Sequence, residues 1–300
     1  MQIGIDLGGT KTEAIGLDGD NVVAPRRRVA TTPDYMGTLD SIARLVHEIE
    51  ADAGSTGSVG VGIPGTVSRT TGLVKNANST WLNGRPLLSD LEMRLGQPVR
   101  VANDANCFAL SEAVDGAGQG LETVFGVILG TGVGGGISIR RRILEGPNQI
   151  AGEWGHNPLP WMTDEERAGA PRCYCGKYGC VETFLSGPGF ERDYAFLSGT
   201  RRSSQDIVRA AADAGDVHAT HALDRYTDRL ARALAVVINV LDPDAVVLGG
   251  GMSNLPRMPS AVSAILPEYV FSDTLATKVV LNVHGDSSGV RGAAWLWGRA

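Results

Sequence analysis

The spacing of hydrophobic residues predicts an alternation of strands and helices along the first 115 residues. Ile3, Ile5 and Leu7 alternate with small or polar residues, which is typical of a strand. Between residues 34 and 53, apolar residues recur three and four positions apart, which places them on one face of a helix. The same two periods predict further strands at 13–17, 21–31, 59–63 and 98–102 and helices at 87–95 and 105–114.

The second half of the chain begins with the same plan. A strand at 123–129 leads through a glycine-rich turn into a strand at 137–143, and residues 115–120 before it have the composition of a hinge. After an irregular stretch come helices at 182–196, 204–214, 217–241 and 290–297 and strands at 245–248 and 279–283. We therefore predict two α/β domains, namely residues 1–116 completed by a C-terminal helix at 288–300, and residues 117–287.

Glycine-rich turns follow three of the predicted strands, at residues 8–9, 130–136 and 249–251. Glycine lets the backbone lie close to a ligand, and the N–H groups of such a turn can converge on an anion. At the first turn, Thr10 and Lys11 add a hydroxyl and a positive charge, and Asp6 could hold Mg²⁺ through water. An ordinary hairpin would explain one Gly-Gly pair. Three such turns predict a nucleotide site assembled from separate strand ends.

Composition and charge narrow the class of protein. Hydrophobic residues make up 43% of the chain, which is enough for substantial cores, and the net charge of −6 argues against a nucleic-acid binder. The longest uncharged apolar run, residues 233–241, is about half of what a membrane span needs, and the N-terminus has no signal-peptide pattern. We expect a cytoplasmic protein with reduced thiols, no membrane partner and no nucleic-acid partner.

Two common nucleotide motifs are excluded. Gly130-x-Gly132-x-x-Gly135 has the spacing of the dinucleotide fingerprint, but the residues that follow continue as a strand, and the fingerprint must open a helix. The chain has no G-x-x-x-x-G-K-[ST] phosphate loop. The large P-loop class is therefore excluded.

Three thiols lie close together at Cys173, Cys175 and Cys180, and the glycines between them allow the sulfurs to face one centre. A tetrahedral zinc site needs a fourth ligand, and His156 is the nearest imidazole in sequence. With three cysteines and one histidine, the site would be closed and structural. A disulfide to Cys180 or free thiols are the alternatives.

Acidic residues supply the remaining candidate chemistry. Asn103 and Asp104 stand where a strand ends and a helix begins, so they are either helix caps or a carboxylate and an amide aimed at a ligand. The helix N-terminus favours an ionised Asp104, which phosphoryl transfer tolerates because it asks mainly for positioning. Glu153 and Glu182 bracket the cysteines and could accept from a polyhydroxylated ligand, although solvated surface positions are the default for glutamate.

Together these motifs resemble the ROK family of sugar kinases over nearly the whole chain. The segments that carry the resemblance are Asp6-Leu7-Gly8-Gly9-Thr10-Lys11, Asn103-Asp104-Ala105-Asn106, Leu129-Gly130-Thr131-Gly132-Val133-Gly134, Gly152-Glu153-Trp154-Gly155-His156, Cys173-x-Cys175-Gly-x-x-Gly-Cys180-x-Glu182 and Leu248-Gly249-Gly250-Gly251. The loop at 76–84, which contains Trp81, and the segment at 155–162 look most like bacterial fructokinases of the manno(fructo)kinase type. They look less like the related N-acetylglucosamine kinases.

The resemblance implies an actin/hexokinase-like (ribonuclease H-like) fold of two α/β domains that close on a central cleft. It implies that Asp104 is the catalytic base for the 6-hydroxyl of the sugar. The sugar would be bound by Asn103, Glu153, His156, Glu182, Gly65 and Asn78. ATP would be bound by Asp6, Gly8, Gly9, Thr10, Lys11, Thr131, Gly132, Gly134, Gly249 and Gly250. Zn²⁺ would be held by His156, Cys173, Cys175 and Cys180, and Mg²⁺ by Asp6.

The sequence thus predicts an ATP- and Mg²⁺-dependent hexose kinase, with D-fructose as the expected substrate. The alternatives are a kinase for N-acetylglucosamine or for several hexoses, and, in another class, a sugar-responsive repressor. Repressors of the family carry an extra N-terminal DNA-binding domain, and here the first strand begins at Gln2. Family members commonly form dimers, so we also expect a homodimer.

Overall fold

The computed structural model describes residues 1–213, 215–255 and 257–298. It divides into two compact units, the first made of residues 1–120, 136–151 and 283–300 and the second of residues 121–135 and 152–282. This division differs from the predicted domains mainly in residues 136–151, which group with the first unit. Gly136 lies so close to α3 (Asp104–Val114) that a Cβ there would be 2.3 Å from the Ala105 carbonyl oxygen. The last two residues of the predicted C-terminal helix lie outside the described part.

The first unit is built on a five-stranded sheet of order β3-β2-β1-β4-β7. Its strands are β1 (Gln2–Leu7), β2 (Lys11–Asp18), β3 (Asn21–Ala30), β4 (Ser58–Ile63) and β7 (Val99–Asn103). β2 pairs antiparallel with β1 and β3, whereas β4 pairs parallel with β1 and β7. Parallel strands have their C-terminal ends at one edge of the sheet. Asp6 near the end of β1 and Asn103 at the end of β7 therefore lie at the same edge, with β4 between their strands.

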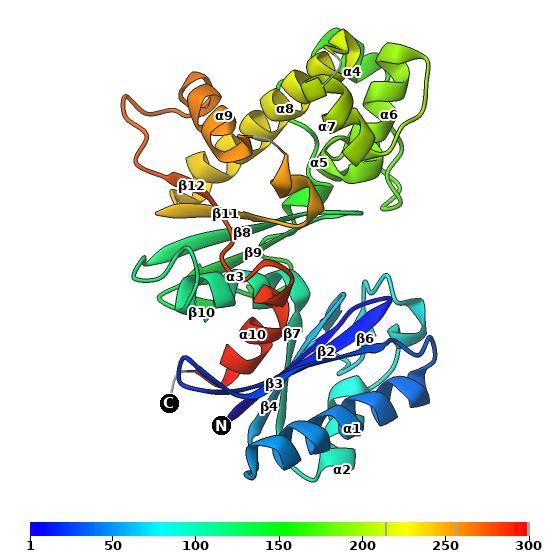
Figure 1. Cartoon of the computed structure of the whole chain (residues 1–300), viewed down its shortest axis with the longest axis vertical. Coiled ribbons are helices and arrows are strands. Elements are labelled where there is room, and N and C mark those ends of the chain that lie inside the picture. The colour runs from blue at the N-terminus through cyan, green and yellow to red at the C-terminus, as the bar shows by residue number, and fades with distance from the viewer. Residues whose placement is uncertain (214, 256, 299–300) are drawn as a thin grey trace. The chain divides into compact units, whose positions relative to one another are not determined.

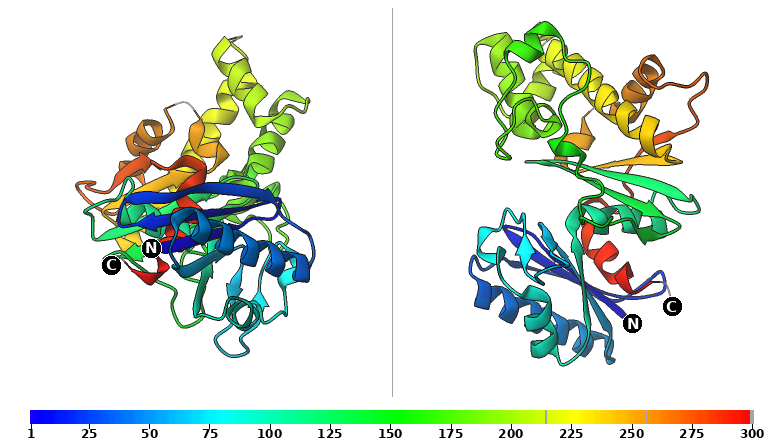
Figure 2. Two further views of the ribbon diagram at one scale, coloured as in Figure 1. Left: turned by 60° about the horizontal axis from the view of Figure 1, so that its bottom comes forward. Right: turned by 180° about the vertical axis from the view of Figure 1, so that it is seen from behind.

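Helices cover both faces of this sheet (Figures 1 and 2). On one face, α1 (Tyr35–Ala53) packs its apolar stripe on the strands together with α2 (Leu87–Leu95). The other face is covered by α3 and α10 (Ser288–Ala294), whose Leu110, Val290 and Ala294 contact Ile15 and Leu17 of β2. The strands are therefore apolar on both sides, as in a sheet buried between helices.

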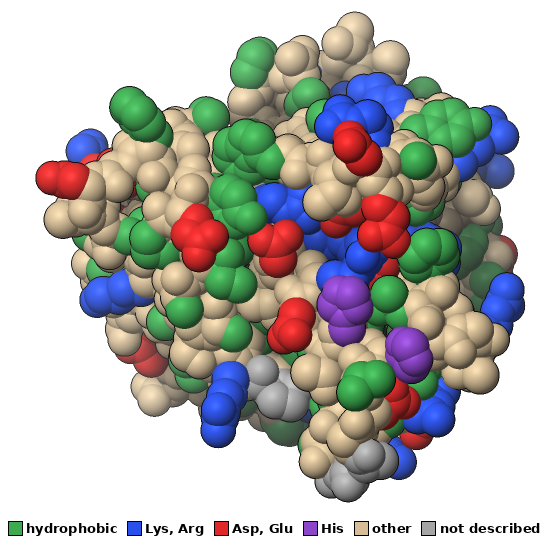
Figure 3. Space-filling model, turned by 90° about the horizontal axis from the view of Figure 1, so that it is seen from above, with side chains coloured by type: hydrophobic (Ala, Val, Ile, Leu, Met, Phe, Trp, Pro, Cys, Tyr) green, Lys and Arg blue, Asp and Glu red, His purple; other side chains and the backbone are tan. Residues whose placement is uncertain are grey.

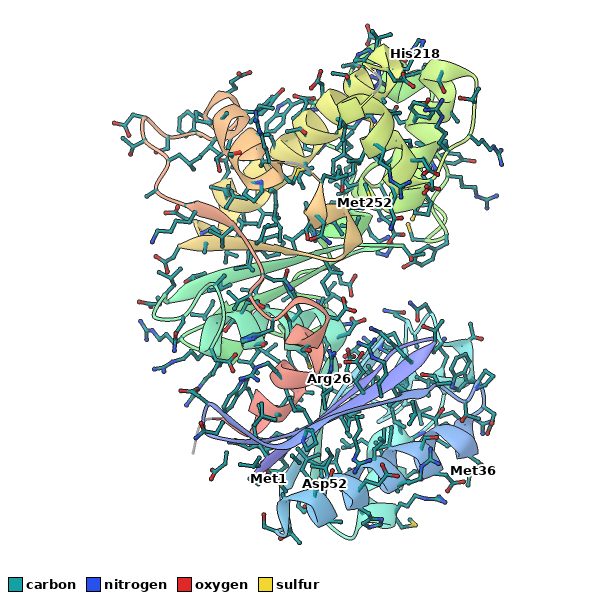
Figure 4. All side chains as sticks on the ribbon, in the orientation of Figure 1. Met1, Arg26, Met36, Asp52, His218 and Met252 are labelled. Atoms are coloured by element: carbon teal, nitrogen blue, oxygen red, sulfur yellow. The ribbon has the colours of Figure 1, made fainter. Side chains whose placement is uncertain are left out.

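The edge strand β3 carries Arg26, Arg27 and Arg28, whose side chains are partly exposed and also paired. Arg27 donates through Nε to Asp52 of α1 at 2.9 Å. Arg26, labelled in Figure 4 near α10, donates to the Ser287 hydroxyl.

The second sheet has the order β10-β9-β8-β11-β12. It consists of β8 (Thr123–Leu129), β9 (Val133–Ile139), β10 (Arg142–Ile143), β11 (Ala245–Gly249) and β12 (Lys278–Leu281). β11 pairs parallel with β8 and β12 and is buried along its length. The strand predicted at 245–248 is confirmed. The helices of the second unit are α4 (Asp164–Ala168), α5 (Val181–Leu185), α6 (Gly187–Ser198), α7 (Ser204–Asp213), α8 (Val217–Leu241) and α9 (Met258–Ile265).

Two predicted elements are divided in the structure. The strand predicted at 137–143 is a hairpin, because Arg140 and Arg141 turn the chain with φ of 52° and 59°. The helix predicted at 182–196 is two helices, because Ser186 is extended and caps α6 by accepting from the Gly189 N–H at 3.2 Å. Residue 214, the predicted end of a helix that began at 204, lies outside the described residues.

Ion pairs within the second unit anchor the segment after residue 160. Arg232 of α8 donates to the carbonyl oxygens of Pro160 and Trp161 and to the Glu166 carboxylate. Burial opposes ionisation of Glu166, but hydrogen bonds from Arg232 and Arg229 lower its pKa to about 2.

The surface drawn in Figure 3 shows basic side chains beside acidic ones. None of the described helices is long and apolar enough to cross a membrane.

Candidate active site

The predicted site residues divide between the two units, and each unit brings its own set together. In the first unit, the turn between β1 and β2 is closed by a hydrogen bond from the Gly8 N–H to the Lys11 carbonyl at 2.9 Å. A Cβ on Gly8 would lie 2.8 Å from that carbonyl oxygen, so glycine is needed there. Gly9 and Thr10 are exposed at the tip. The turn is thus both a tight hairpin and an accessible loop of backbone N–H groups.

A buried carboxylate next to this turn gathers three cations. The Glu13 side chain is 1% exposed, and its oxygens lie 3.1 Å from Lys11 Nζ, 2.7 Å from Arg28 Nη2 and 3.5 Å from Arg26 Nη1. Glu13 therefore holds Lys11 beside the turn. The sequence does not mark Glu13 as a site residue, because nothing in a strand pattern shows which polar side chain is buried.

The charge of Asp104 acts on the buried carboxylate of Asp6. Burial, followed by the charges of Asp104 and Glu13, raises the pKa of Asp6 from 3.8 to about 7, against an opposing effect of Lys11. Asp6 also packs on the start of α10, where a Cβ on Gly289 would lie 2.7 Å from Asp6 Oδ2. A buried carboxylate whose pKa is raised further by the charges of two other carboxylates marks a place where a cation would be stabilised.

Replacing Asp6 by asparagine should raise the melting temperature at pH 8 by about 2–4 °C. The raised pKa means that ionising Asp6 costs stability in the folded protein, and this cost grows between pH 4 and 7 and is constant above pH 7. The gain should therefore shrink as the pH falls below 7. Differential scanning fluorimetry from pH 4 to 8 measures it, with Asp18→Asn at the exposed end of β2 as the control. A shift that is equal at pH 5 and pH 8 would contradict this assignment.

Asn103 and Asp104 stand at the β7–α3 junction, as predicted. Both side chains accept from the Ala105 N–H, at 2.9 and 2.8 Å, so the capping role is real. Both residues are partly exposed, which leaves their polar atoms within reach of a ligand.

The predicted sugar contact Gly65 is brought to Asn103. Asn103 Nδ2 donates to the Gly65 carbonyl at 3.2 Å. Gly65 has a φ of 110°, and a Cβ there would lie 2.9 Å from Ala77 N. The loop that contains exposed Asn78 therefore lies directly behind Gly65. Trp81 fixes this loop by packing on the core and donating to Thr38 Oγ1 at 3.2 Å.

In the second unit, the turn between β8 and β9 lies against the end of β11. Gly250 has a φ of 85°, and a Cβ there would lie 2.4 Å from the Leu129 carbonyl oxygen. Thr131 is exposed in the turn, and the Gly130 N–H donates to the Gly132 carbonyl at 2.9 Å. The structure thus brings together the second and third glycine-rich turns. β9 continues as a strand, which confirms that the dinucleotide fingerprint was rightly rejected.

The four predicted metal ligands form one cluster. Their ligand atoms all lie within 4.8 Å of one another, with Cys173 Sγ 3.5 Å from His156 Nδ1 and Cys175 Sγ 3.6 Å from Cys180 Sγ. Zn–S bonds of about 2.3 Å in a tetrahedron put sulfurs about 3.8 Å apart, so the donor set and its spacing fit zinc. All four cysteines of the chain are free thiols, which argues against the disulfide alternative.

The two bracketing glutamates have different surroundings. Glu153 is exposed, and its charge helps to raise the pKa of Tyr174 to about 12, a shift caused first by burial and then by Glu182. Glu182 accepts from the Val133 N–H at 3.0 Å. The Tyr174 hydroxyl lies 2.9 Å from His156 Nε2 and so orients the imidazole. Nothing in the sequence marked Tyr174 as a site residue.

A sequence profile of the ROK family matches residues 2–300. The chain belongs to the ROK family. Two curated N-acetyl-D-glucosamine kinases, from Vibrio cholerae and Aliivibrio fischeri, are 41% and 40% identical to this ROK chain, and each alignment covers 99% of both chains. Among solved structures, a ROK hexokinase from Thermus thermophilus superposes with a TM-score of 0.87 at 30% identity, covering 98% of this chain and 97% of that one.

A ROK family glucokinase from Streptomyces griseus, solved with glucose and AMPPNP, superposes with a TM-score of 0.78 at 29% identity and covers 98% of both chains. The expected actin/hexokinase-like α/β fold of the ROK family is therefore confirmed. The expected fructokinase subtype is not supported, because the curated relatives named above are N-acetyl-D-glucosamine kinases.

Proposed function

We propose that this ROK chain is an ATP-dependent sugar kinase and that its preferred substrate is N-acetylglucosamine, phosphorylated at the 6-hydroxyl. The observation that carries this proposal is the 41% identity over 99% of both chains with an N-acetyl-D-glucosamine kinase. Fructose, the first expectation, rested on two short loops. Identity along the whole chain is the stronger support, since substrate choice depends on the shape of the whole pocket.

In this proposal, Asp104 accepts the proton of the sugar hydroxyl as the hydroxyl oxygen attacks the γ-phosphorus of ATP, the bond from that phosphorus to the bridging oxygen breaks, and ADP leaves. Two observations support this role for Asp104. It is partly exposed at the N-terminus of α3, and its charge helps to raise the pKa of Asp6. Asn103, Gly65 and Asn78 line the same junction and would orient the sugar. Because the transition state of phosphoryl transfer is loose, positioning contributes more than early deprotonation.

The nucleotide would be bound by the glycine-rich turns. Gly8, Gly9, Thr10 and Lys11 would take phosphates from the first unit, and Thr131, Gly132 and Gly134 from the second. Gly249 and Gly250 would lie near the adenosine. When bound, Mg²⁺ would neutralise phosphate charge, and Asp6 is the residue proposed to hold it.

The second unit would supply the other sugar contacts through Glu153, His156 and Glu182. Zn²⁺ held by His156 and the three cysteines would keep their loop in shape and would take no part in the chemistry. A homodimer stays a prediction.

A coupled ADP-release assay tests the proposed function. The purified chain should turn over with ATP and Mg²⁺, and its kcat/KM should be highest for N-acetylglucosamine in a panel with fructose, mannose, glucose and N-acetylmannosamine. Higher kcat/KM for fructose would return the substrate to the first expectation. No ADP release with any of the five sugars would remove the kinase proposal.

A further inference from the structure

The β8–β9 turn, which is the proposed phosphate turn of the second unit, is held at three positions by one other segment. The Gly130 carbonyl accepts from the Gly187 N–H at 2.8 Å. The Val133 N–H donates to Glu182 Oε2 at 3.0 Å. The Gly134 carbonyl accepts from the Trp154 indole Nε1 at 3.0 Å. All three partners come from residues 154–187, so this segment determines the course of the turn.

The turn and the segment 154–187 are in close contact at two glycines of the turn region. A Cβ on Gly132 would lie 2.7 Å from Glu182 Oε2, and one on Gly135 would lie 2.6 Å from Trp154 Cδ1. The Trp154 ring is 4% exposed and packs edge-on against Phe125 of β8, with 5.6 Å between ring centroids. A displacement of Trp154 or Glu182 toward the turn must therefore move the turn.

The same segment carries the four metal ligands. Trp154 is two residues before His156, in the same 3₁₀ helix (Trp154–His156), and Glu182 is two residues after Cys180, in the first turn of α5. The ligand atoms of the cluster lie within 4.8 Å of one another, so one ion would tie both ends of the segment together. Folding of such a loop is coupled to metal binding.

We infer that Trp154 and Glu182 are positioning residues through which the Cys₃His metal site sets the geometry of the phosphate turn. The metal would then support nucleotide binding as well as sugar binding. This inference rests on the proposed function, because it takes the β8–β9 turn to be a phosphate site. Trp154 is the better residue for testing this inference, because Glu182 is also a proposed sugar contact.

Trp154→Phe isolates the indole hydrogen bond, because phenylalanine keeps an aromatic ring against Phe125. We expect the Kd of AMPPNP, measured by isothermal titration calorimetry on the zinc-loaded protein, to rise about three- to tenfold. The Kd of N-acetylglucosamine should change less than twofold. Trp297→Phe is the matched control: it removes an indole bond to the Val59 carbonyl, 2.7 Å long, in the first unit. It should leave both Kd values unchanged.

Removing zinc with a chelator provides a second test that needs no substitution. AMPPNP should bind more weakly to the zinc-free protein, and there Trp154→Phe should add little, because the two changes act on one element. An AMPPNP affinity that neither zinc removal nor Trp154→Phe lowers, in a wild type that binds AMPPNP, would overturn this inference alone. A wild type that binds no AMPPNP would overturn the proposed function and the inference with it.

Discussion

Replacing Asp104 by asparagine is expected to lower kcat by about a thousandfold while the Kd of the sugar changes less than tenfold. Asparagine keeps the shape of the side chain and an oxygen that can accept from the Ala105 N–H, so the start of α3 should stay intact. What it loses is the ability to accept the hydroxyl proton. ADP-release kinetics give kcat, and calorimetry with N-acetylglucosamine gives Kd.

Asp52→Asn is the matched control for this prediction, because Asp52 pairs with Arg27 at the end of α1 and not with a proposed site residue. Its kcat should stay within about twofold of the wild type. An Asp104→Asn protein with near-normal kcat would remove Asp104 from the role of base, whatever the control does.

Loss of the metal site should have the second largest effect. Cys175→Ser removes one of four ligands at an exposed position, so it should lower the zinc content, measured by elemental analysis, without opening a cavity in the core. Because His156 and Glu182 depend on this loop for their positions, we expect kcat/KM for the sugar to fall about a hundredfold. Zinc content and kcat/KM should fall together.

Cys107→Ala is the control for the thiol substitution. Cys107 is buried in α3, in the first unit, and is not a member of the cluster. The variant should retain its zinc and lose at most some stability. A Cys175→Ser protein that is free of zinc and fully active would make the metal site incidental to function.

The elements that sequence predicts best here are those whose signals are local. The alternation in β1, the strand-to-helix junction at Asn103 and Asp104, and the spacing of the three cysteines all depend on neighbouring residues. Each of these was placed correctly, because period and capping chemistry act over a few residues.

Contacts between distant parts of the chain could not be predicted in the same way. The Glu182 carboxylate on the Val133 N–H joins residues 49 positions apart, and a glutamate looks the same in sequence whether it is solvated or buried. Burial of Glu13 among Lys11, Arg26 and Arg28, and the raised pKa of Asp6, likewise arise only when strands and helices are packed.

Substrate preference shows the same limit. The loops at 76–84 and 155–162 suggested fructose, but Trp81 is fixed by the core and Trp161 stacks on Tyr269, with ring centroids 5.5 Å apart. These aromatic residues anchor their loops structurally. Their presence in a motif therefore says less about the sugar than about how the loop is held.

The most direct test of the account is to identify the product. Purified protein should be incubated with ATP, Mg²⁺ and N-acetylglucosamine, and the product examined by phosphorus-31 NMR correlated to the sugar protons. We expect one new phosphate monoester coupled to the protons on carbon 6, together with ADP. A phosphate on another carbon, or unchanged sugar with ATP intact, would contradict it.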